Sequence, residues 1–413
     1  MRSRALFHKH AMKLKPDTIA MTVTLGLLTA LGPLATDMYL PSLPAMAQKL
    51  NADIPQIQLT LSGFLVGFAL CQIAYGPVSD RLGRRKVLVF SLLAFTVASA
   101  ACTLAHSVEM LVVARFAQAL GAGGGVVIAR AVVRDLYDAD RAGQELALMG
   151  TILGIVPLFA PTLGALLHEV FGWRSNFAVM AGFGLAGAAF IHFAMPETLK
   201  FEFVRPATLR SIAADFAALV RNPFFRVYLV FACCAYGGLF SFLSASSFVL
   251  QQVYGLSPMT FGIAFACPVL GYMAGTLAGR RITRQRGIDG TIALGALTLL
   301  TGGLLAVALT ETAAPGTQAW RLLVPSAIYF AGVGLVLPQA LAGAMTPFPE
   351  RAGTASSLVG FTQMSVAAII GIVVSANLSS DARALTIALA VMGSTAFAAH
   401  LASRRMRAGV LPR

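Results

Sequence analysis

The stretch that decides the fold of this chain is Gly76-Pro77-Val78-Ser79-Asp80-Arg81-Leu82-Gly83-Arg84-Arg85-Lys86. Gly83 permits a tight turn, and the basic residues around it would anchor that turn at an anionic membrane surface. Asp80 has potential partners in Arg84, in the 134–140 segment and at the positive start of a later helix. The spacing is too particular for a generic basic loop, so we predict a turn that gates conformational change. Its candidate residues are Gly76, Asp80, Arg81, Gly83, Arg84 and Arg85.

The composition of the whole chain places this turn between membrane spans. Of the 413 residues, 57% are hydrophobic and only 12% are charged, with a mean hydropathy of +0.77, whereas soluble proteins carry about 25% charged residues. Apolar runs of about 20 residues, enough to cross a bilayer, recur along the chain. The predicted spans are 18–47, 54–78, 86–105, 108–136, 142–168, 174–195, 224–252, 257–280, 289–310, 321–346, 352–378 and 383–402. We therefore predict an all-α integral membrane protein with twelve transmembrane helices.

The net charge of +14 reflects membrane topology and not a nucleic-acid partner. Most of the 31 Lys and Arg residues lie in or beside the two tails and the loops of one predicted face. The opposite face carries Lys49, Arg174, Arg321 and Arg383. This distribution follows the positive-inside rule and puts both termini in the cytoplasm. Short alternating loops gather no single basic surface for nucleic acid, so we expect a multi-pass protein of the cell inner membrane.

A polar interruption from Lys200 to Arg221 divides the spans into six and six. This layout is typical of transporters whose two pseudo-symmetric halves enclose a site at the membrane midplane. We predict a cytoplasmic basic N-tail, an N-terminal six-helix half, a cytoplasmic central loop, a C-terminal six-helix half and a cytoplasmic C-tail. Their boundaries are 1–17, 18–199, 200–222, 223–403 and 404–413.

Asp37 is a carboxylate within a span that is otherwise almost free of charge. An ionisable group at membrane depth is costly and usually faces a cavity or a polar partner. Pro33 and Pro41 bracket this residue and leave backbone carbonyls without their helical donors, as expected for a helix that lines a cavity. The other acids lie at predicted membrane edges or in loops. We therefore predict that Asp37 is the sole deep proton carrier and that one proton moves per transport cycle.

These motifs resemble those of the major facilitator superfamily, whose signature loop between the second and third helices has the pattern of residues 76–86. Within that superfamily, Leu34-Ala35-Thr36-Asp37-Met38-Tyr39-Leu40-Pro41 is similar to the first-helix signature of the Bcr/CflA branch of drug/proton antiporters. Residues 115–123 resemble the family's second motif, and residues 150–165 resemble its antiporter motif. The resemblance covers the whole chain and implies the major facilitator fold with export by alternating access.

The resemblance implies roles for two further spans. Arg115 stands where the family's arginine is thought to tune protonation of the first-helix carboxylate. Whether it reaches Asp37 directly, through water, or binds a carbonyl of the first span stays open at this stage. Prolines and small residues of the antiporter motif are expected to let helices pack closely and move: Gly154, Pro157, Pro161 and Gly164. Ala160 and Ala165 depart from the usual glycine but remain small.

The predicted substrate site is an apolar, aromatic cavity between the halves. Its candidate contacts are Tyr39, Phe64, Phe68, Tyr236, Phe240, Phe242, Tyr329 and Phe330, with Gln118 and Gln339 for polar contacts. The cysteines and histidines show no metal-ligand spacing, and no reactive cluster suggests an enzyme. We predict no catalytic residue, no metal and no cofactor beyond protons as the coupling ion. A monomer in the lipid bilayer is expected.

The motifs and the resemblance together predict proton-coupled efflux of small hydrophobic drugs or toxic compounds across the inner membrane. The alternative is a proton-coupled transporter of a specific metabolite, through export of a sugar, amino acid or siderophore or through uptake by symport. A charged metabolite would need a second deep charge besides Arg115, and the C-terminal half offers none. A membrane sensor would need a signalling domain, and a lipid-modifying enzyme would need a reactive cluster.

Overall fold

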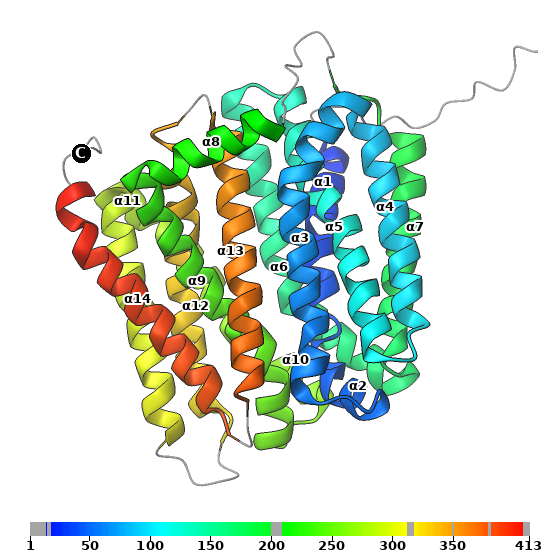
Figure 1. The fold of residues 1–413 in the computed structure, drawn as a ribbon, viewed down its shortest axis with the longest axis vertical. Helices are drawn as coiled ribbons and strands as arrows, with labels where there is room; N and C mark the ends of the chain where they lie inside the picture. Colours follow the sequence, from blue (N-terminus) through cyan, green and yellow to red (C-terminus); the bar gives the residue numbers. More distant parts are fainter. Residues whose placement is uncertain are drawn as a thin grey trace, which may run out of the picture.

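The structure, a computed structural model, describes residue 14 and residues 18–199, 209–311, 318–348, 351–378 and 381–407. Over these residues it contains helices and no strand, arranged as two bundles side by side (Figure 1). The predicted tail 1–17, apart from residue 14, and residues 408–413 lie outside the described residues. The predicted central loop 200–222 contains a helix, α8 (Leu209–Arg221).

Each bundle contributes six membrane-crossing segments. The N-terminal bundle comprises α1 (Ile19–Asp37), a 3-10 turn η1 (Leu40–Ser42), α2 (Leu43–Lys49), α3 (Ile54–Leu82), α4 (Arg84–Thr103), α5 (Val108–Leu136), α6 (Ala139–Phe171) and α7 (Arg174–Ala194). The C-terminal bundle comprises α9 (Pro223–Phe248), a π-turn η3 (Val249–Val253), α10 (Pro258–Ala264), α11 (Ala266–Glu311), α12 (Trp320–Met345), α13 (Ala352–Ala376) and α14 (Arg383–Arg407). The short α2 and α10 lie at one end of the molecule (Figure 1).

Two of the predicted spans are joined in α11. Among the described residues, eleven helical segments are long and apolar enough to cross a membrane, and one of them runs from Pro258 to Thr310. Gly287 interrupts this segment with φ 68° and ψ −177°. The hydroxyls of Thr283 and Thr291 lie 2.9 Å apart, although eight residues of straight helix would span about 12 Å. The chain therefore turns back at Gly287, and the segment holds two spans, which gives the predicted twelve.

Local capping sets where the long helices begin. α3 starts at a capping box in which an Asp53 carboxylate oxygen accepts the Gln56 backbone N–H at 2.8 Å, and the Gln56 side chain accepts the Asp53 N–H at 2.9 Å. The Ser107 hydroxyl caps α5, and the Asn222 side chain caps α9. Because these polar side chains satisfy the free N–H groups of the first turn, each helix can begin at the edge of an apolar run.

The turn between α3 and α4 forms a dense network of charges. The guanidinium of Arg84 contacts Asp80 at 2.5 Å and Asp135, near the end of α5, at 2.8 Å. Glu197 accepts the backbone N–H of Arg84 at 2.8 Å and so caps α4. Gly83 has φ +95°, and a Cβ there would lie 2.6 Å from a Glu197 carboxylate oxygen. Of the partners considered for Asp80, the structure shows Arg84, and the turn connects α3, α4 and α5.

The two bundles meet most closely at one end. We call this end, which carries α2 and α10, the α10 face, and the opposite end, which carries α8 and the Gly83 turn, the α8 face. Four hydrogen bonds join the bundles near the α10 face: the Gln58 amide to the Ser244 carbonyl, the Ser247 hydroxyl to the Leu40 carbonyl (2.5 Å), the Gln251 amide to the Pro41 carbonyl (3.0 Å) and the Met259 N–H to the Glu169 carboxylate (3.3 Å).

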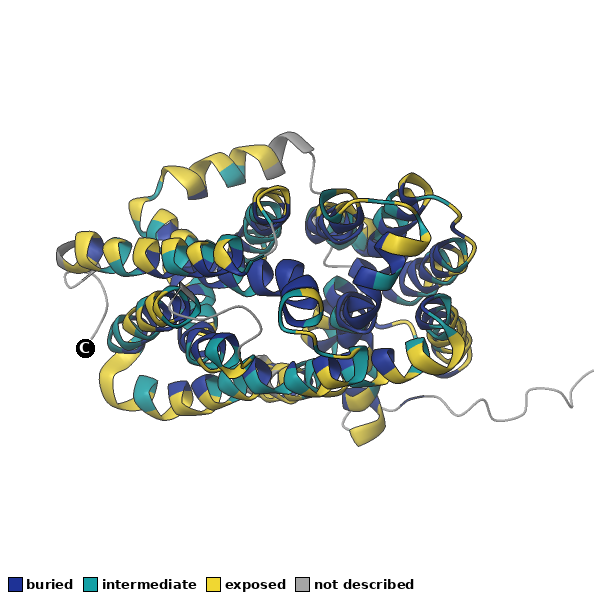
Figure 2. Ribbon diagram, turned by 90° about the horizontal axis from the view of Figure 1, so that it is seen from below, coloured by how far each residue is buried: buried dark blue, intermediate teal, exposed yellow. Residues whose placement is uncertain are grey.

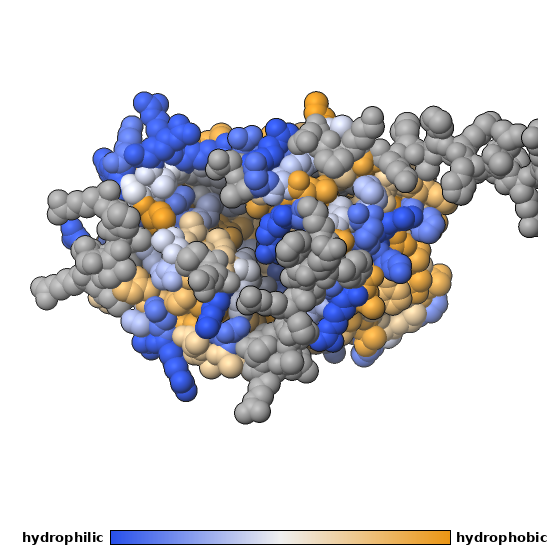
Figure 3. Space-filling model, turned by 90° about the horizontal axis from the view of Figure 1, so that it is seen from above, coloured by the Kyte–Doolittle hydropathy of each residue, from blue (hydrophilic) through white to orange (hydrophobic). Residues whose placement is uncertain are grey.

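The two ends of the molecule differ in how they close. Viewed from the α10 face, buried residues gather where the bundles meet (Figure 2). Viewed from the α8 face, hydrophilic residues surround a hollow between the bundles (Figure 3). The helix α8 lies over the C-terminal bundle at this end, where it packs on α9 and α13, and Asp215 pairs with Arg351 at 3.1 Å. The conformation is therefore held closed on the α10 side.

Candidate transport site

A cavity of about 330 Å³ lies between the two bundles. Its walls come from α1, α3, α5 and α6 of the N-terminal bundle and from α9, α11, α12 and α13 of the C-terminal bundle. Most of its lining side chains are apolar or aromatic, and its charged lining residues within the described chain are Asp37 and Arg130. Since both bundles contribute to its walls, any movement of one bundle against the other must change its shape.

Asp37 lies at the end of α1 and is 4% exposed. α1 ends here because Pro41 has no N–H to donate to the Asp37 carbonyl, and the chain continues into η1. The Thr36 hydroxyl donates to the Asp37 carboxylate at 2.9 Å. No Lys or Arg of the described residues forms an ion pair with Asp37. A proton can therefore neutralise this carboxylate, and a hydrogen-bond donor of a bound molecule can satisfy its oxygens.

Arg115 binds the backbone of α1 and not the carboxylate of Asp37. Its Nη1 donates to the Ala35 carbonyl at 3.0 Å and to the Gln118 side chain at 2.5 Å. The guanidinium carbon lies 4.3 Å from the ring centroid of Tyr39 and 4.4 Å from that of Phe64. The residue is fully buried. Of the three possibilities left open by the sequence, the structure shows the carbonyl of the first span, so Arg115 holds α5 against α1 two residues before Asp37.

Five of the predicted substrate contacts line the cavity: Phe64, Phe68, Tyr236, Phe240 and Phe330. They come from α3, α9 and α12, so the aromatic surface is shared between both bundles. On each side the rings form close pairs, with centroids 5.9 Å apart for Phe64 and Phe68 and 5.7 Å apart for Tyr236 and Phe240. Such a surface suits an apolar or aromatic molecule.

Two polar candidates of the N-terminal bundle lie outside the cavity lining. The Tyr39 side chain is fully buried, with its hydroxyl 3.2 Å from that of Thr60. Gln118 is also fully buried and donates to the Ser99 hydroxyl at 2.8 Å. The Tyr39 ring lies against the Arg115 guanidinium, and the Gln118 amide oxygen accepts a hydrogen bond from it. Their polar atoms are therefore engaged within the bundle, and the prediction that they contact substrate does not fit this conformation.

Three candidates of the C-terminal bundle are also outside the lining. Phe242 is fully buried and packs against Phe330 with ring centroids 5.4 Å apart, and the Tyr329 hydroxyl donates to the Cys234 carbonyl at 3.1 Å. Gln339 is half-buried and does not line the cavity. The reason is helical geometry, because neighbouring residues point about 100° apart. Where Phe330 faces the cavity, Tyr329 must face another helix.

The antiporter-motif residues divide along α6. Gly154 and Pro157 line the cavity. Pro161 contacts α10, since a Cβ at Gly262 would lie 3.0 Å from the Pro161 carbonyl oxygen. At Gly164 a Cβ would lie 1.7 Å from the Met38 carbonyl oxygen. The first part of the motif thus shapes the cavity, and the second part allows α6 to cross α1 and α10.

The sequence reasoning assigned no role to several polar groups that the structure brings inward. Arg130, Gln72 and Gln363 line the cavity, and their common signal is a polar residue inside an apolar span. Glu145, near the start of α6, is 3% exposed and accepts the Thr22 hydroxyl at 2.6 Å. Asp37 is therefore not the only buried acid, although it is the acid that lines the cavity within the described chain.

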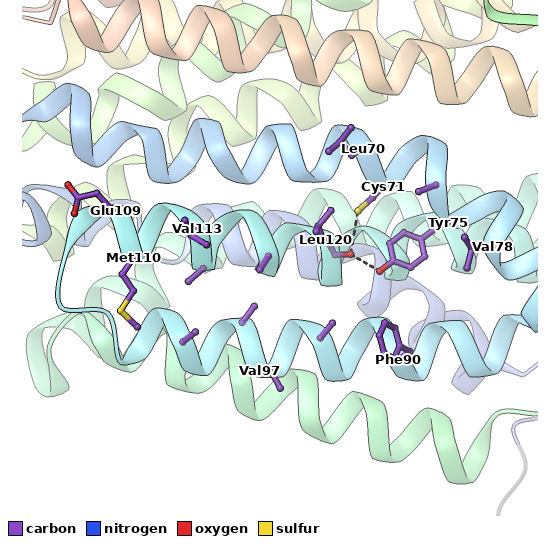
Figure 4. A pocket seen from close by; sticks show the side chains of 16 residues that line it. Leu70, Cys71, Tyr75, Val78, Phe90, Val97, Glu109, Met110, Val113 and Leu120 are labelled. Carbon is purple, nitrogen blue, oxygen red and sulfur yellow. Dashed lines mark hydrogen bonds between the residues drawn. The ribbon is translucent and has the colours of Figure 1, made fainter. Parts of the chain in front are cut away.

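A larger hollow of about 940 Å³ lies between α3, α4 and α5 on the outside of the N-terminal bundle (Figure 4). Phe90, Val97 and Val113 line it and are each about 70% exposed. The Tyr75 hydroxyl is bound to the Leu120 carbonyl at 2.8 Å. An exposed apolar surface of this kind suits lipid acyl chains. It lies within one half and does not adjoin the other, so alternation of the halves would leave it unchanged.

Two six-helix halves around a shared cavity are the architecture of multi-pass membrane transporters. The profile of the Major Facilitator Superfamily matches residues 25–372, and the chain belongs to this family. The predicted superfamily and fold are thus confirmed. Members of this family are transporters and not enzymes.

Individual relatives agree with the predicted Bcr/CflA-type resemblance. A "Bicyclomycin resistance protein homolog" of Haemophilus influenzae is 30% identical, over 90% of this chain and 93% of its own length. "Multidrug resistance protein D" of Escherichia coli is 32% identical, over 84% of this chain and 86% of its own length. The solved structure of a D-xylose–proton symporter covers 92% of this chain and 96% of its own, with a TM-score of 0.73 and 15% identity, and so shares the fold.

Proposed function

We propose that the protein is a proton-coupled antiporter that exports small hydrophobic drugs or toxic compounds across the inner membrane. The observation that carries this proposal is Asp37, a buried carboxylate without a cationic partner among the described residues, in a cavity with apolar and aromatic walls. Two relatives are named for bicyclomycin and multidrug resistance, which is consistent with export of such compounds.

The orientation follows from the charges. The α8 face carries the basic turn after α3 and the basic residues near Gly287, so the positive-inside rule assigns this face to the cytoplasm. Both termini then lie in the cytoplasm, and the conformation that is closed on the α10 side receives substrate from inside the cell. The protein acts as a monomer in the lipid bilayer, with the proton as coupling ion and no resident cofactor.

Competition between proton and substrate at Asp37 couples proton entry to substrate export. A proton that reaches the carboxylate from outside neutralises it, and a hydrogen-bond donor of an entering substrate can stabilise the ionised carboxylate and so release the proton inside. Asp37 also lies next to the closure between the halves, because the carbonyls of Leu40 and Pro41, just beyond it, accept hydrogen bonds from Ser247 and Gln251 of the C-terminal half. A change of charge at Asp37 can therefore act on the α10-side closure through η1.

One proton is sufficient for useful export. Movement of one charge through 100 mV supplies about 2.3 kcal/mol. Since 1.4 kcal/mol corresponds to a tenfold ratio, this energy sustains a drug gradient of about 50-fold.

The test uses purified protein in liposomes that contain a pH-sensitive dye, with an imposed proton gradient and added candidate drugs. We expect the wild type to show drug-triggered proton movement and Asp37→Asn to show none. Glu145→Gln is the matched control, because Glu145 is an equally buried carboxylate outside the cavity lining, and it should keep the response. Drug-linked proton movement in Asp37→Asn would reject Asp37 as the carrier, and its absence from the wild type would reject antiport for those drugs.

A further inference from the structure

We propose that Arg130 is a substrate-recognition residue at the cytoplasmic entrance of the cavity, and that it selects amphiphiles with one carboxylate or other anionic group on an apolar body. This inference rests on the proposed function only in taking the central cavity as the substrate site. Arg130 lies near the end of α5, lines that cavity and has an exposed side chain. It is the basic residue among the described lining residues.

The guanidinium of Arg130 is available for a ligand. Among the residues whose placement the structure describes, no hydrogen bond or ion pair engages it. Arg115, the other arginine within the α5 span, differs because it is fully buried and bound to α1. An arginine presents five donors in a planar fork that matches the two oxygens of a carboxylate. A free guanidinium directed into a cavity is therefore suited to bind an anionic group.

The surroundings of Arg130 make the entrance positive. Arg134 follows one helical turn later, and its Nη1 would lie 3.4 Å from a Cβ at Gly353, in the first turn of α13. That first turn contains no acidic residue, so the positive end of the helix dipole is not compensated there. The nearby acids have other partners, since Asp135 binds Arg84 and Glu145 binds Thr22. The entrance thus attracts anions and repels cations.

The two cavity charges lie far apart along the bundle. α5 and α1 are antiparallel and touch where a Cβ at Gly125 would lie 2.5 Å from the Leu28 carbonyl oxygen. From this contact Arg130 lies five residues toward the α8 face, and Asp37 lies nine residues toward the α10 face. At 1.5 Å per residue the two charges are about 20 Å apart along the axis. Phe68 and Tyr236 are among the residues that line the cavity with them.

This separation defines how an amphiphile would bind. Its anionic group contacts Arg130 at the entrance, its apolar body lies on the aromatic surface, and a hydrogen-bond donor at its far end reaches Asp37. A permanently cationic drug of the same size must instead pass Arg130 and Arg134 without a compensating acid. The substrate class is therefore anionic or zwitterionic amphiphiles in preference to quaternary ammonium compounds.

The test measures binding without any proton gradient. Purified full-length protein in detergent is titrated with three fluorescent probes of one dansyl-type scaffold that end in a carboxylate, an amide or a quaternary ammonium group. We expect the carboxylate probe to bind the wild type about tenfold or more tightly than the ammonium probe. Arg130→Gln should abolish most of this preference, and Arg130→Lys should keep part of it. Arg280→Gln is the matched control, because it removes one positive charge from α11 outside the cavity lining, and it should leave the preference unchanged.

Equal binding of the carboxylate and ammonium probes to the wild type would overturn the proposal, even if a variant fails to fold. An unchanged preference in a folded Arg130→Gln, or an equal loss in Arg280→Gln, would also overturn it. Because this experiment measures binding, its result does not depend on whether the protein transports the probe. Charge selection without proton-linked flux would support the role of Arg130 and count against antiport, and flux without charge selection would do the reverse.

Discussion

Among the described glycines, Gly164 has the least room for a methyl group, and it packs against the backbone of Met38, the residue after Asp37. The Cβ of Gly164→Ala would lie 1.7 Å from the Met38 carbonyl oxygen, 2.6 Å from its carbonyl carbon and 2.9 Å from its Cα. Contacts of a Cβ below 3.0 Å are essentially never observed. The Met38 carbonyl and α6 must therefore separate by more than 1 Å, which is about the difference between 3.0 Å and 1.7 Å. The obstacle is backbone, which cannot rotate away as a side chain can.

The cost can be estimated from overpacking. Insertion of a methyl group into a tight core costs about 1–3 kcal/mol, and a clash with backbone belongs at the upper end. Alanine recovers about 0.5–1 kcal/mol through its higher helix propensity. We therefore expect Gly164→Ala to lose about 2 kcal/mol of stability. Since Met38 directly follows Asp37, the displacement should also lower proton coupling in the fraction of protein that folds.

Gly154→Ala provides the matched control on the same helix. No heavy atom lies within 4 Å of a Cβ at Gly154, so this change should be neutral or stabilise the protein by up to about 1 kcal/mol. The assay is thermal unfolding of both purified variants in one detergent, followed by monodispersity on size exclusion. Equal melting midpoints for the two variants would refute the packing argument, because it depends on the difference between their surroundings.

Three further changes test other contacts. Ser247→Ala with Gln251→Ala removes two hydrogen bonds of the α10-side closure at about 1 kcal/mol each, so spin-label distances across that face should shift toward an open population by roughly 30-fold. An unaltered distance distribution would contradict this role. Gly83→Ala should cost about 1–3 kcal/mol because of its positive φ, whereas Gly76→Ala, with no atom within 4 Å of the new Cβ, should melt like the wild type. Arg115→Leu removes the donor to the Ala35 carbonyl and to the Gln118 amide oxygen, both buried, so we expect a loss of about 3 kcal/mol of stability. An unchanged melting midpoint would show that these hydrogen bonds are dispensable.

The sequence alone was sufficient for the class of protein, the family and the number of spans. Hydropathy depends on composition over about 20 consecutive residues, and the bilayer imposes that length on every span. The turn from Gly76 to Lys86 could also be predicted from the sequence, because Asp80 and Arg84 lie only four residues apart on either side of Gly83. The position of Asp37 at a cavity was also inferable, since a carboxylate in a span has few other places to lie.

The tertiary structure decided which face of each helix meets the cavity. Phe330 and Tyr329 are neighbours in the chain, yet one lines the cavity and the other is bound to the Cys234 carbonyl. A helix that is apolar all round carries no stripe that would fix its rotation, so sequence periodicity could not choose between them. Packing against neighbouring helices made the choice.

The partners of buried polar groups were also decided only by the fold. Arg115 binds a carbonyl of α1, Glu145 binds Thr22 across 123 positions of the chain, and Arg130 faces the cavity without a described partner. In the sequence, Arg115 and Arg130 are isolated charges in an apolar span and Glu145 is an acid at a membrane edge, and the atoms that bind Arg115 and Glu145 come from distant segments. Hydropathy therefore determined that these groups lie in the membrane, and only the assembly of the helices determined whether each one joins helices or faces the transport cavity.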